Sequence, residues 1–433
     1  MLSKEETKEL DKKHVVHGWA VNDQLDPMVV EKSEGVYFWD AEGNKYLDFS
    51  SALVNMNVGH QHPKVVEAIK AQADQLCYIH PSMATSARSE LGAALAERTP
   101  GDLNQFFFSL GGADANENAI KLARLVTGKL KILAKWRSYH GATYGAISAS
   151  ADPRRPPVEP GVPGMIHFLD PFCYRCPFGL EYPSCNLHCA EHVKQTIEME
   201  SPDTIAAIII ESQTGGPGFY APPPGYMERL RELCDEYGIL LICDEVMVGF
   251  GRTGKWFAIE HAEGVVPDML TMAKGLTCGY IPLGAVAISD RIMESLDGQF
   301  LFIGLTYNAH PVGCAAAVAT IGVYKDENLI ENSAQLGELL LNRITAMKDK
   351  YELIGDARGT GLFACLDLVA DRSSKTPLVA EKMAKFGPAF KARGLSTNVI
   401  GNRIFIGPPL IITEAQLNEG LDIIEAVLAE IQD

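Results

Sequence analysis

The middle of the chain alternates between short apolar runs and longer amphipathic stretches. The apolar runs cover residues 105–108, 131–134, 205–210, 239–243, 269–272 and 284–288. Between them, stretches such as residues 226–237 place apolar side chains at helical spacing. Continuous apolar strands separated by helices predict an α/β fold with a mostly parallel sheet covered on both faces. Active sites in such sheets lie beyond the carboxyl ends of the strands, so the residues after each run are candidates for chemistry.

The two ends of the chain follow a different pattern. Residues 36–39 and 45–48 flank a Glu-Gly-Asn turn, which predicts a hairpin. Near the other end, Thr413 stands at an N-cap position and Gln416 completes a capping box, which predicts a last helix. The apolar face of that helix contains Leu417, Leu421, Ile424, Leu428 and Ile431.

These patterns predict three segments. Residues 61–325 are expected to form a large domain, while residues 1–60 and 326–433 contribute a smaller α+β domain. Residues 153–164 are rich in proline, so we expect an irregular excursion there instead of a core element.

Composition narrows the class of protein. A chain of 433 residues with 47% apolar content can bury a large core. Its net charge of −17 argues against nonspecific binding to nucleic acids or anionic membranes. The first residues are polar and charged, and the apolar run 205–210 is too short to span a bilayer. We therefore expect a cytoplasmic protein with neither a nucleic-acid nor a membrane partner.

Ten cysteines are scattered along the chain, and four of them are close together in sequence. Cys173 and Cys176 are followed by Cys185 and Cys189, with two histidines nearby. The spacing resembles a structural zinc site. The alternative is a proline-stiffened surface excursion with free thiols, so the sequence leaves metal binding open and we assign no metal ligand.

Lys274 and Asp244 are the candidates for catalysis. Asp244 ends the run 239–243, and Lys274 follows the run 269–272. A lysine amine can condense with the aldehyde of pyridoxal phosphate (PLP), and an acid can keep the pyridine nitrogen protonated so that the ring accepts electrons. Lysines and acids at strand ends are common, so the pair needs support from other positions.

Three further positions provide that support. A strand, a glycine turn and a helix start follow one another around Gly111, Gly112 and Ala113, and this arrangement suits a phosphate group. Tyr139 and His140 follow another strand, where an aromatic ring can cover a flat heterocycle. Glu211 ends a wholly apolar strand and therefore needs a partner or a role in a site.

The order of these motifs resembles that of the class III aminotransferases of PLP fold type I. The motifs are the Gly-Gly turn, Tyr139-His140-Gly141, Glu211, Asp244-Glu245-Val246 with the glycine-rich residues 249–254, Ala273-Lys274-Gly275, and Thr306 to Pro311. The similarity extends from about residue 36 to the C-terminus. It implies a large domain with a mostly parallel seven-stranded sheet and a smaller domain built from both ends of the chain.

The resemblance also implies roles for individual residues. Lys274 would carry the cofactor and move a proton, and Asp244 would pair with the pyridinium nitrogen. Tyr139, which we also count among the catalytic residues, and Val246 would cover the two faces of the ring, with His140 beside them. The remaining cofactor contacts would come from Gly111, Gly112, Ala113 and Glu211.

The family also implies a homodimer or higher homo-oligomer, because Thr306 resembles a threonine that reaches the phosphate of the neighbouring subunit. For the substrate, we nominate Leu53 and Asn55 near the entrance. A mobile arginine of related enzymes aligns with Asn398, so we nominate Arg403, five residues away, as its replacement.

The expected activity is transfer of a terminal amino group from an ω-amino acid or amine, taurine-like or β-alanine-like, to pyruvate or 2-oxoglutarate. The alternative on the same scaffold is a PLP-dependent phospholyase that acts on an amino-alcohol phosphate. A non-catalytic protein is disfavoured, because burying a lysine and an acid without a ligand is costly.

Overall fold

The computed structural model describes residues 2–432. Its central sheet has seven strands in the order β4-β10-β9-β8-β7-β5-β6. These strands are β4 (Gln105–Ser109), β5 (Lys131–Lys135), β6 (Met165–Phe168), β7 (Ile205–Glu211), β8 (Leu240–Asp244), β9 (Met269–Met272) and β10 (Gly284–Ile288). Only β10 runs antiparallel to its neighbours within this sheet. The predicted α/β class with a mostly parallel sheet is confirmed.

Helices cover both faces of this sheet, as the sequence predicts. Ile208 and Ile210 of β7 belong to one hydrophobic core, which α7 (His188–Met199) and α8 (Tyr226–Tyr237) complete. Ala207 and Ile209 of the same strand belong to a second core, shared with α5 (Gly112–Thr127). Because successive strand residues point to opposite faces, this division shows that both faces are buried.

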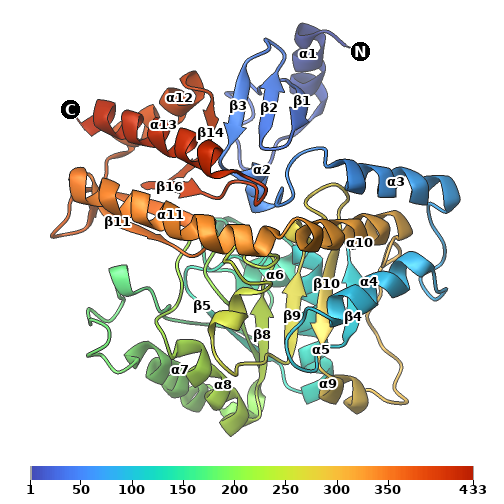
Figure 1. Cartoon of the computed structure of the whole chain (residues 1–433). Helices are drawn as coiled ribbons and strands as arrows, with labels where there is room; N and C mark the ends of the chain where they lie inside the picture. The colour runs from blue at the N-terminus through green and yellow to red at the C-terminus, as the bar shows by residue number, and fades with distance from the viewer. Residues whose placement is uncertain (1, 433) are drawn as a thin grey trace.

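The first three quarters of the chain contain further helices. They are α1 (Lys4–His14), α2 (Ser51–Val54), α3 (Pro63–Gln75), α4 (Ser86–Ala96), α6 (Tyr144–Ala149), α9 (Asp290–Ser295) and α10 (Pro311–Asp326). Figure 1 shows that α1 and α2 lie apart from the central sheet, beside the rest of the N-terminal segment. Among the described residues, no helix is long and apolar enough to cross a membrane.

The two ends of the chain meet in one sheet. The hairpin predicted near residue 40 forms β2 (Tyr37–Asp40) and β3 (Lys45–Asp48), with β1 (Val30–Glu34) beside it. On the other side of β3 lies β14 (Leu395–Ser396), in parallel pairing. Figure 1 shows this blue N-terminal sheet next to the red C-terminal helices. A smaller α+β unit built from both termini is therefore confirmed.

The C-terminal part adds a second small sheet and three helices. Its strands are β11 (Ile354–Gly359), β12 (Ala364–Asp371), β13 (Thr376–Pro377), β15 (Asn398–Ile400) and β16 (Arg403–Ile406), and its helices are α11 (Leu329–Lys350), α12 (Ala380–Ala392) and α13 (Glu414–Gln432). At the start of α13, the amide of Gln416 donates to Thr413 Oγ1 over 3.3 Å, and the amide of Thr413 donates to Gln416 Oε1 over 3.0 Å. This confirms the predicted capping box.

A buried arginine joins the terminal segments to the large sheet. Arg252 donates from Nε to Asn57 Oδ1 over 2.8 Å, from Nη2 to Ser51 Oγ over 2.9 Å, and from Nη1 to the carbonyl of Pro408 over 2.5 Å. Burial lowers the pKa of Arg252 to about 10. Arg252 lies in residues 249–254, so this glycine-rich loop ties the terminal segments to the chain that follows β8.

Candidate active site

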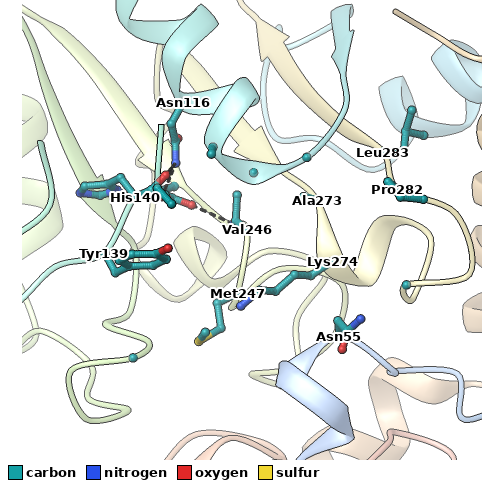
Figure 2. A pocket seen from close by; sticks show the side chains of 18 of the residues that line it. Asn55, Asn116, Tyr139, His140, Val246, Met247, Ala273, Lys274, Pro282 and Leu283 are labelled. Atoms are coloured by element: carbon teal, nitrogen blue, oxygen red, sulfur yellow. Dashed lines mark hydrogen bonds and ion pairs between the residues drawn. The ribbon is translucent and has the colours of Figure 1, made fainter. Parts of the chain in front are cut away.

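A cavity of about 510 Å³ lies at the carboxyl ends of the central strands. Glu211 is the last residue of β7 and Asp244 is the last residue of β8. Lys274 follows β9 and Tyr139 follows β5 by a few residues. All four line the cavity, and Figure 2 shows the side chains of Tyr139, Val246 and Lys274 pointing into the same space. The strand-end rule therefore located the cavity correctly.

Lys274 holds an amine that faces this cavity without a hydrogen-bond or ion-pair partner within residues 2–432. Its backbone is left-handed, with φ of 40°, a conformation that costs a non-glycine residue about 1–3 kcal/mol. Desolvation lowers the pKa of the amine to about 8, against the opposing charges of Asp244 and Glu211. A lysine with a lowered pKa is a better nucleophile and base at neutral pH.

Asp244 is held by donors from three directions. Its Oδ2 accepts from Asn116 Nδ2 and lies 2.8 Å from His140 Nδ1, while its Oδ1 accepts from the amide of Val246 over 3.0 Å. His140 Nε2 is buried without a partner among the described residues, so Nδ1 is the ring nitrogen that meets Asp244. The three contacts together fix the orientation of the carboxylate.

The phosphate turn lies at the start of α5. Gly112 is the first helical residue, and no side chain caps this helix start. A Cβ at Gly112 would lie 2.6 Å from Val246 Cγ1, so only glycine fits against that side chain. Free amides and the positive end of a long helix therefore face the cavity close to Val246, an arrangement that fits a phosphate group.

Glu211 connects two walls of the cavity. Its Oε1 accepts from the amide of Tyr139 over 3.0 Å, and its Oε2 accepts from the amide of Gly215 over 2.6 Å. The Tyr139 wall and the segment after β7 are thus held by one side chain.

The cavity thus combines four features. They are an amine without a partner among the described residues, an oriented acid, a helix N-terminus and an aromatic wall. A family model described as aminotransferase class-III matches residues 19–428. The chain belongs to the class III aminotransferase family.

Three known proteins are similar to this class III aminotransferase over nearly its whole length. The structure of taurine:2-oxoglutarate aminotransferase from Bifidobacterium kashiwanohense, in complex with PLP and glutamate, has a TM-score of 0.95 and 40% identity, and the match covers 100% of this chain and 99% of that one. Taurine–pyruvate aminotransferase of Bilophila wadsworthia is 35% identical over 95% of this chain and 94% of its own length. Leucine/methionine racemase of Thermococcus litoralis is 40% identical over 94% of this chain and 92% of its own length.

The likeness to PLP-dependent transaminases confirms the predicted PLP fold type I, the aminotransferase class and the cofactor. The geometry of the cavity is compatible with this cofactor, because its donor set offers amides for a phosphate, an acid for a ring nitrogen and an amine for an aldehyde.

Several predicted contact residues of the class III aminotransferase lie outside the cavity. Leu53 is 53% exposed, whereas Asn55 lines the cavity. Thr306 is exposed, and its carbonyl accepts from the hydroxyl of Tyr78 over 2.6 Å. Arg403 is half-buried and donates to the carbonyl of Pro217 instead of pointing at Lys274. The structure thus brings Asn55 to the cofactor residues but not Leu53, Thr306 or Arg403.

Sequence reasoning missed Arg154. Its guanidinium carbon lies 3.5 Å from the centre of the Tyr139 ring and 5.4 Å from that of Trp19, and both aromatic residues line the cavity. Arg154 also pairs with Asp152. The residue stands in the proline-rich stretch that we expected to be an excursion away from the core. That stretch is irregular, as predicted, but it places a cation over Tyr139, a residue that lines the cavity, while Arg154 itself lies behind the lining.

The cysteine-rich segment forms a separate small cavity of about 20 Å³, lined by Cys173, Cys176, Cys185 and Cys189 together with His188. All ten cysteines are free. Within residues 2–432, no group of three or more histidine, cysteine, aspartate or glutamate side chains is arranged to hold a metal ion. The zinc interpretation therefore gains no support from the geometry.

Proposed function

We propose that the enzyme transfers the terminal amino group of a short ω-amino acid with an anionic far end, such as taurine or β-alanine, to pyruvate or 2-oxoglutarate. The observation that carries this proposal is Arg154, a cation held over Tyr139 beside the cavity. The taurine aminotransferases among its relatives point to the same substrate class.

We assign the cofactor contacts to the residues that line the cavity. Amides of Gly111, Gly112 and Ala113 would hold the phosphate, and Asp244, supported by His140, would hold the ring nitrogen. Tyr139 and Val246 would cover the ring faces, and Glu211 would fix Tyr139. When bound, PLP supplies an aldehyde for a covalent link to an amine and a ring that withdraws electrons from the neighbouring carbon.

Lys274 would do the proton transfer. Its Nζ faces the cavity and has no hydrogen-bond or ion-pair partner among the described residues, so it would be free to act on a bound substrate. With a pKa of about 8, a useful fraction of the amine is unprotonated near neutral pH. Nζ can then take the proton from the carbon that bears the amino group and return a proton nearby, at high effective concentration.

Arg154 would bind the carboxylate or sulfonate of the substrate. Desolvation is the main cause of the lowered pKa of Lys274, and the charge of Arg154 adds to it in the same direction, which supports placing Arg154 near the reacting amine. The field of Arg154 disfavours a second positive charge on the substrate and favours a negative one. The Asp152 partner fixes the guanidinium and leaves part of the side chain accessible, at 34% exposure.

Racemisation is the second candidate, because the leucine/methionine racemase shares 40% identity over nearly the whole chain. A racemase returns the proton to the same carbon from the opposite face and consumes no 2-oxo acid. The phospholyase alternative likewise needs no acceptor and releases phosphate. The two alternatives therefore differ from transamination in their products.

We also propose a homodimer in which Thr306 completes the site of the partner subunit. Thr306 lies away from its own cavity, on an exposed segment with Phe300 and Phe302, each 76% exposed. Large exposed apolar side chains favour a protein interface.

We further propose a cytoplasmic location, since ten free thiols are typical of a reducing compartment.

A substrate panel with two arginine variants tests the proposal. The holoenzyme is assayed with taurine, β-alanine, putrescine, L-leucine and ethanolamine phosphate, each with and without pyruvate or 2-oxoglutarate. We expect turnover of taurine or β-alanine only with an acceptor, with one new amino acid formed per acceptor consumed.

Arg154→Met should raise KM for the anionic amine at least about tenfold, the loss expected for one charge-assisted contact. Arg155→Met is the matched control, because Arg155 is the next residue but pairs with Glu159 over 2.6 Å and lies over Trp136, which does not line the cavity. Turnover restricted to neutral amines, phosphate release without acceptor, or racemised L-leucine without acceptor would each contradict the proposal.

A further inference from the structure

A second lysine is buried close to the active site and has no part in the proposed mechanism. Lys135, the last residue of β5, is 1% exposed. Its Nζ donates to Thr214 Oγ1 over 2.8 Å and to the carbonyl of Arg137 over 2.9 Å, and it lies 3.7 Å from Glu211 Oε1. Burying a charged amine is costly, so its retention at this position calls for a role.

Glu211 has no other charged partner among the described residues, and its two oxygens serve different walls of the cavity. One oxygen accepts from the amide of Tyr139 and the other from the amide of Gly215. A carboxylate accepts at both oxygens, whereas an amide such as glutamine places a donor at one of the two positions. The amine of Lys135 lies 3.7 Å from Oε1, pairs with the carboxylate and holds it where both contacts form.

The second wall is a glycine-rich hairpin, residues 214–220. It closes through paired backbone hydrogen bonds between Thr214 and Tyr220. On the side of the C-terminal sheet, Arg358 donates to the carbonyl of Gly218 over 2.9 Å and Arg403 donates to that of Pro217. On the side of the central sheet, Lys135 and Glu211 hold Thr214 and Gly215. Gly216, at its tip, lines the cavity.

We propose that Lys135 is a positioning residue that, through Glu211, fixes two walls of the cofactor cavity, the Tyr139 wall and the hairpin of residues 214–220. Lys135 touches neither cofactor nor substrate. Its effect reaches them through the ring of Tyr139 and the backbone of Gly216. The inference rests on the proposed cofactor site at Lys274 and Tyr139, but not on which amine is the substrate.

The test uses four variants of the full-length protein, together with Lys274→Ala as the reference for the cofactor site. Lys135→Met removes the charge, and Lys135→Arg keeps it. The double variant K135M/E211Q leaves no uncompensated buried charge, so it provides a folded protein if Lys135→Met alone does not fold. Lys131→Met is the matched control, because Lys131 lies on the same strand and pairs with Glu200 over 2.7 Å, away from the cavity.

The readouts are the PLP dissociation constant of the apoprotein, the circular dichroism induced in the bound cofactor, and kcat and KM for the amine. Induced dichroism reports the asymmetric walls around the ring, which a role in stability alone does not change. We expect Lys135→Met and the double variant to bind PLP at least tenfold more weakly and to lose at least half of the induced dichroism. Lys135→Arg should stay within threefold of wild type, and Lys131→Met within twofold.

The inference fails if the charge-free variants keep the dissociation constant and the dichroism of wild type, or if Lys135→Arg is impaired as much as Lys135→Met. Lys274→Ala separates this outcome from failure of the proposed cofactor site. One outcome is that Lys274→Ala loses the absorbance band of the covalently bound cofactor while Lys135→Met keeps the dissociation constant and dichroism of wild type. In that case only the role of Lys135 is overturned. If Lys274→Ala keeps the band, the proposed site itself is wrong.

Discussion

Lys135 and Lys274 are two lysines in the same part of the molecule with opposite surroundings. Lys135 ends β5 in a closed pocket, where its amine is paired with Glu211 and with two oxygen acceptors. Lys274 follows β9 and faces an open cavity, where its amine has no partner among the described residues. Desolvation is the main cause that lowers the pKa of both amines.

The difference shows that burial alone does not make a lysine reactive. The amine of Lys135 is occupied by two oxygen acceptors and by Glu211, so it holds these groups in place. The amine of Lys274 has space around it and a left-handed backbone that directs it into the cavity. Space and missing partners, together with a lowered pKa, distinguish the nucleophile from the structural cation.

The largest effect is expected at Lys274. Lys274→Ala should lower kcat by at least about 10²–10⁴-fold, the usual contribution of a positioned acid–base group. The variant should also lose the absorbance of the covalently bound cofactor while keeping the circular dichroism of the folded backbone. Steady-state turnover and absorbance spectra measure both. If Lys274→Ala kept the turnover of wild type, Lys274 would not be the reactive lysine, and its contrast with Lys135 would be wrong.

A loss of stability is expected at Lys135. Lys135→Met leaves the carboxylate of Glu211 buried without its cation, so the free energy of unfolding should fall by about 3–5 kcal/mol. Lys131→Met breaks a partly exposed pair and should cost about 1 kcal/mol or less. Urea denaturation of the apoproteins compares the two variants. Equal losses would mean that the buried pair contributes no more than the surface pair.

The smallest effect concerns pH. Because the unprotonated amine is the nucleophile and the pKa of Lys274 is about 8, loading of PLP onto apoprotein should accelerate by about tenfold per pH unit below that value and level off above it. Stopped-flow absorbance between about pH 6 and pH 9.5 follows the reaction. A rate that continues to rise toward the ordinary lysine pKa of 10.5 would contradict the lowered pKa.

The sequence predicts those parts of the site that follow directly from strand ends. Long uninterrupted apolar runs identify β7, β8 and β9, and parallel strands bring their carboxyl ends to one edge of the sheet. The apolar runs alone therefore place Glu211, Asp244 and Lys274 at that shared edge. By contrast, β6 was not predicted, because it is short and carries His167 among its four residues.

Contacts that depend on tertiary packing were not predictable in the same way. Asn116 lies on α5, where its helical position gives no sign that it meets Asp244, a residue 128 positions away. Arg154 lies in a proline-rich loop, and nothing in that local pattern indicates that the loop returns to Tyr139. Arg403 was chosen because it lies five residues from Asn398, but the register of β16 directs its side chain to Pro217.

The central claim is that Lys274, and not the other buried lysine, carries the cofactor. Borohydride reduction of the holoenzyme makes the link between lysine and PLP permanent, and peptide mass spectrometry then locates the added pyridoxyl phosphate. We predict one modified lysine per chain, in the peptide that contains Lys274, and unmodified Lys135. A modification on Lys135, or on any lysine other than Lys274, would contradict the claim.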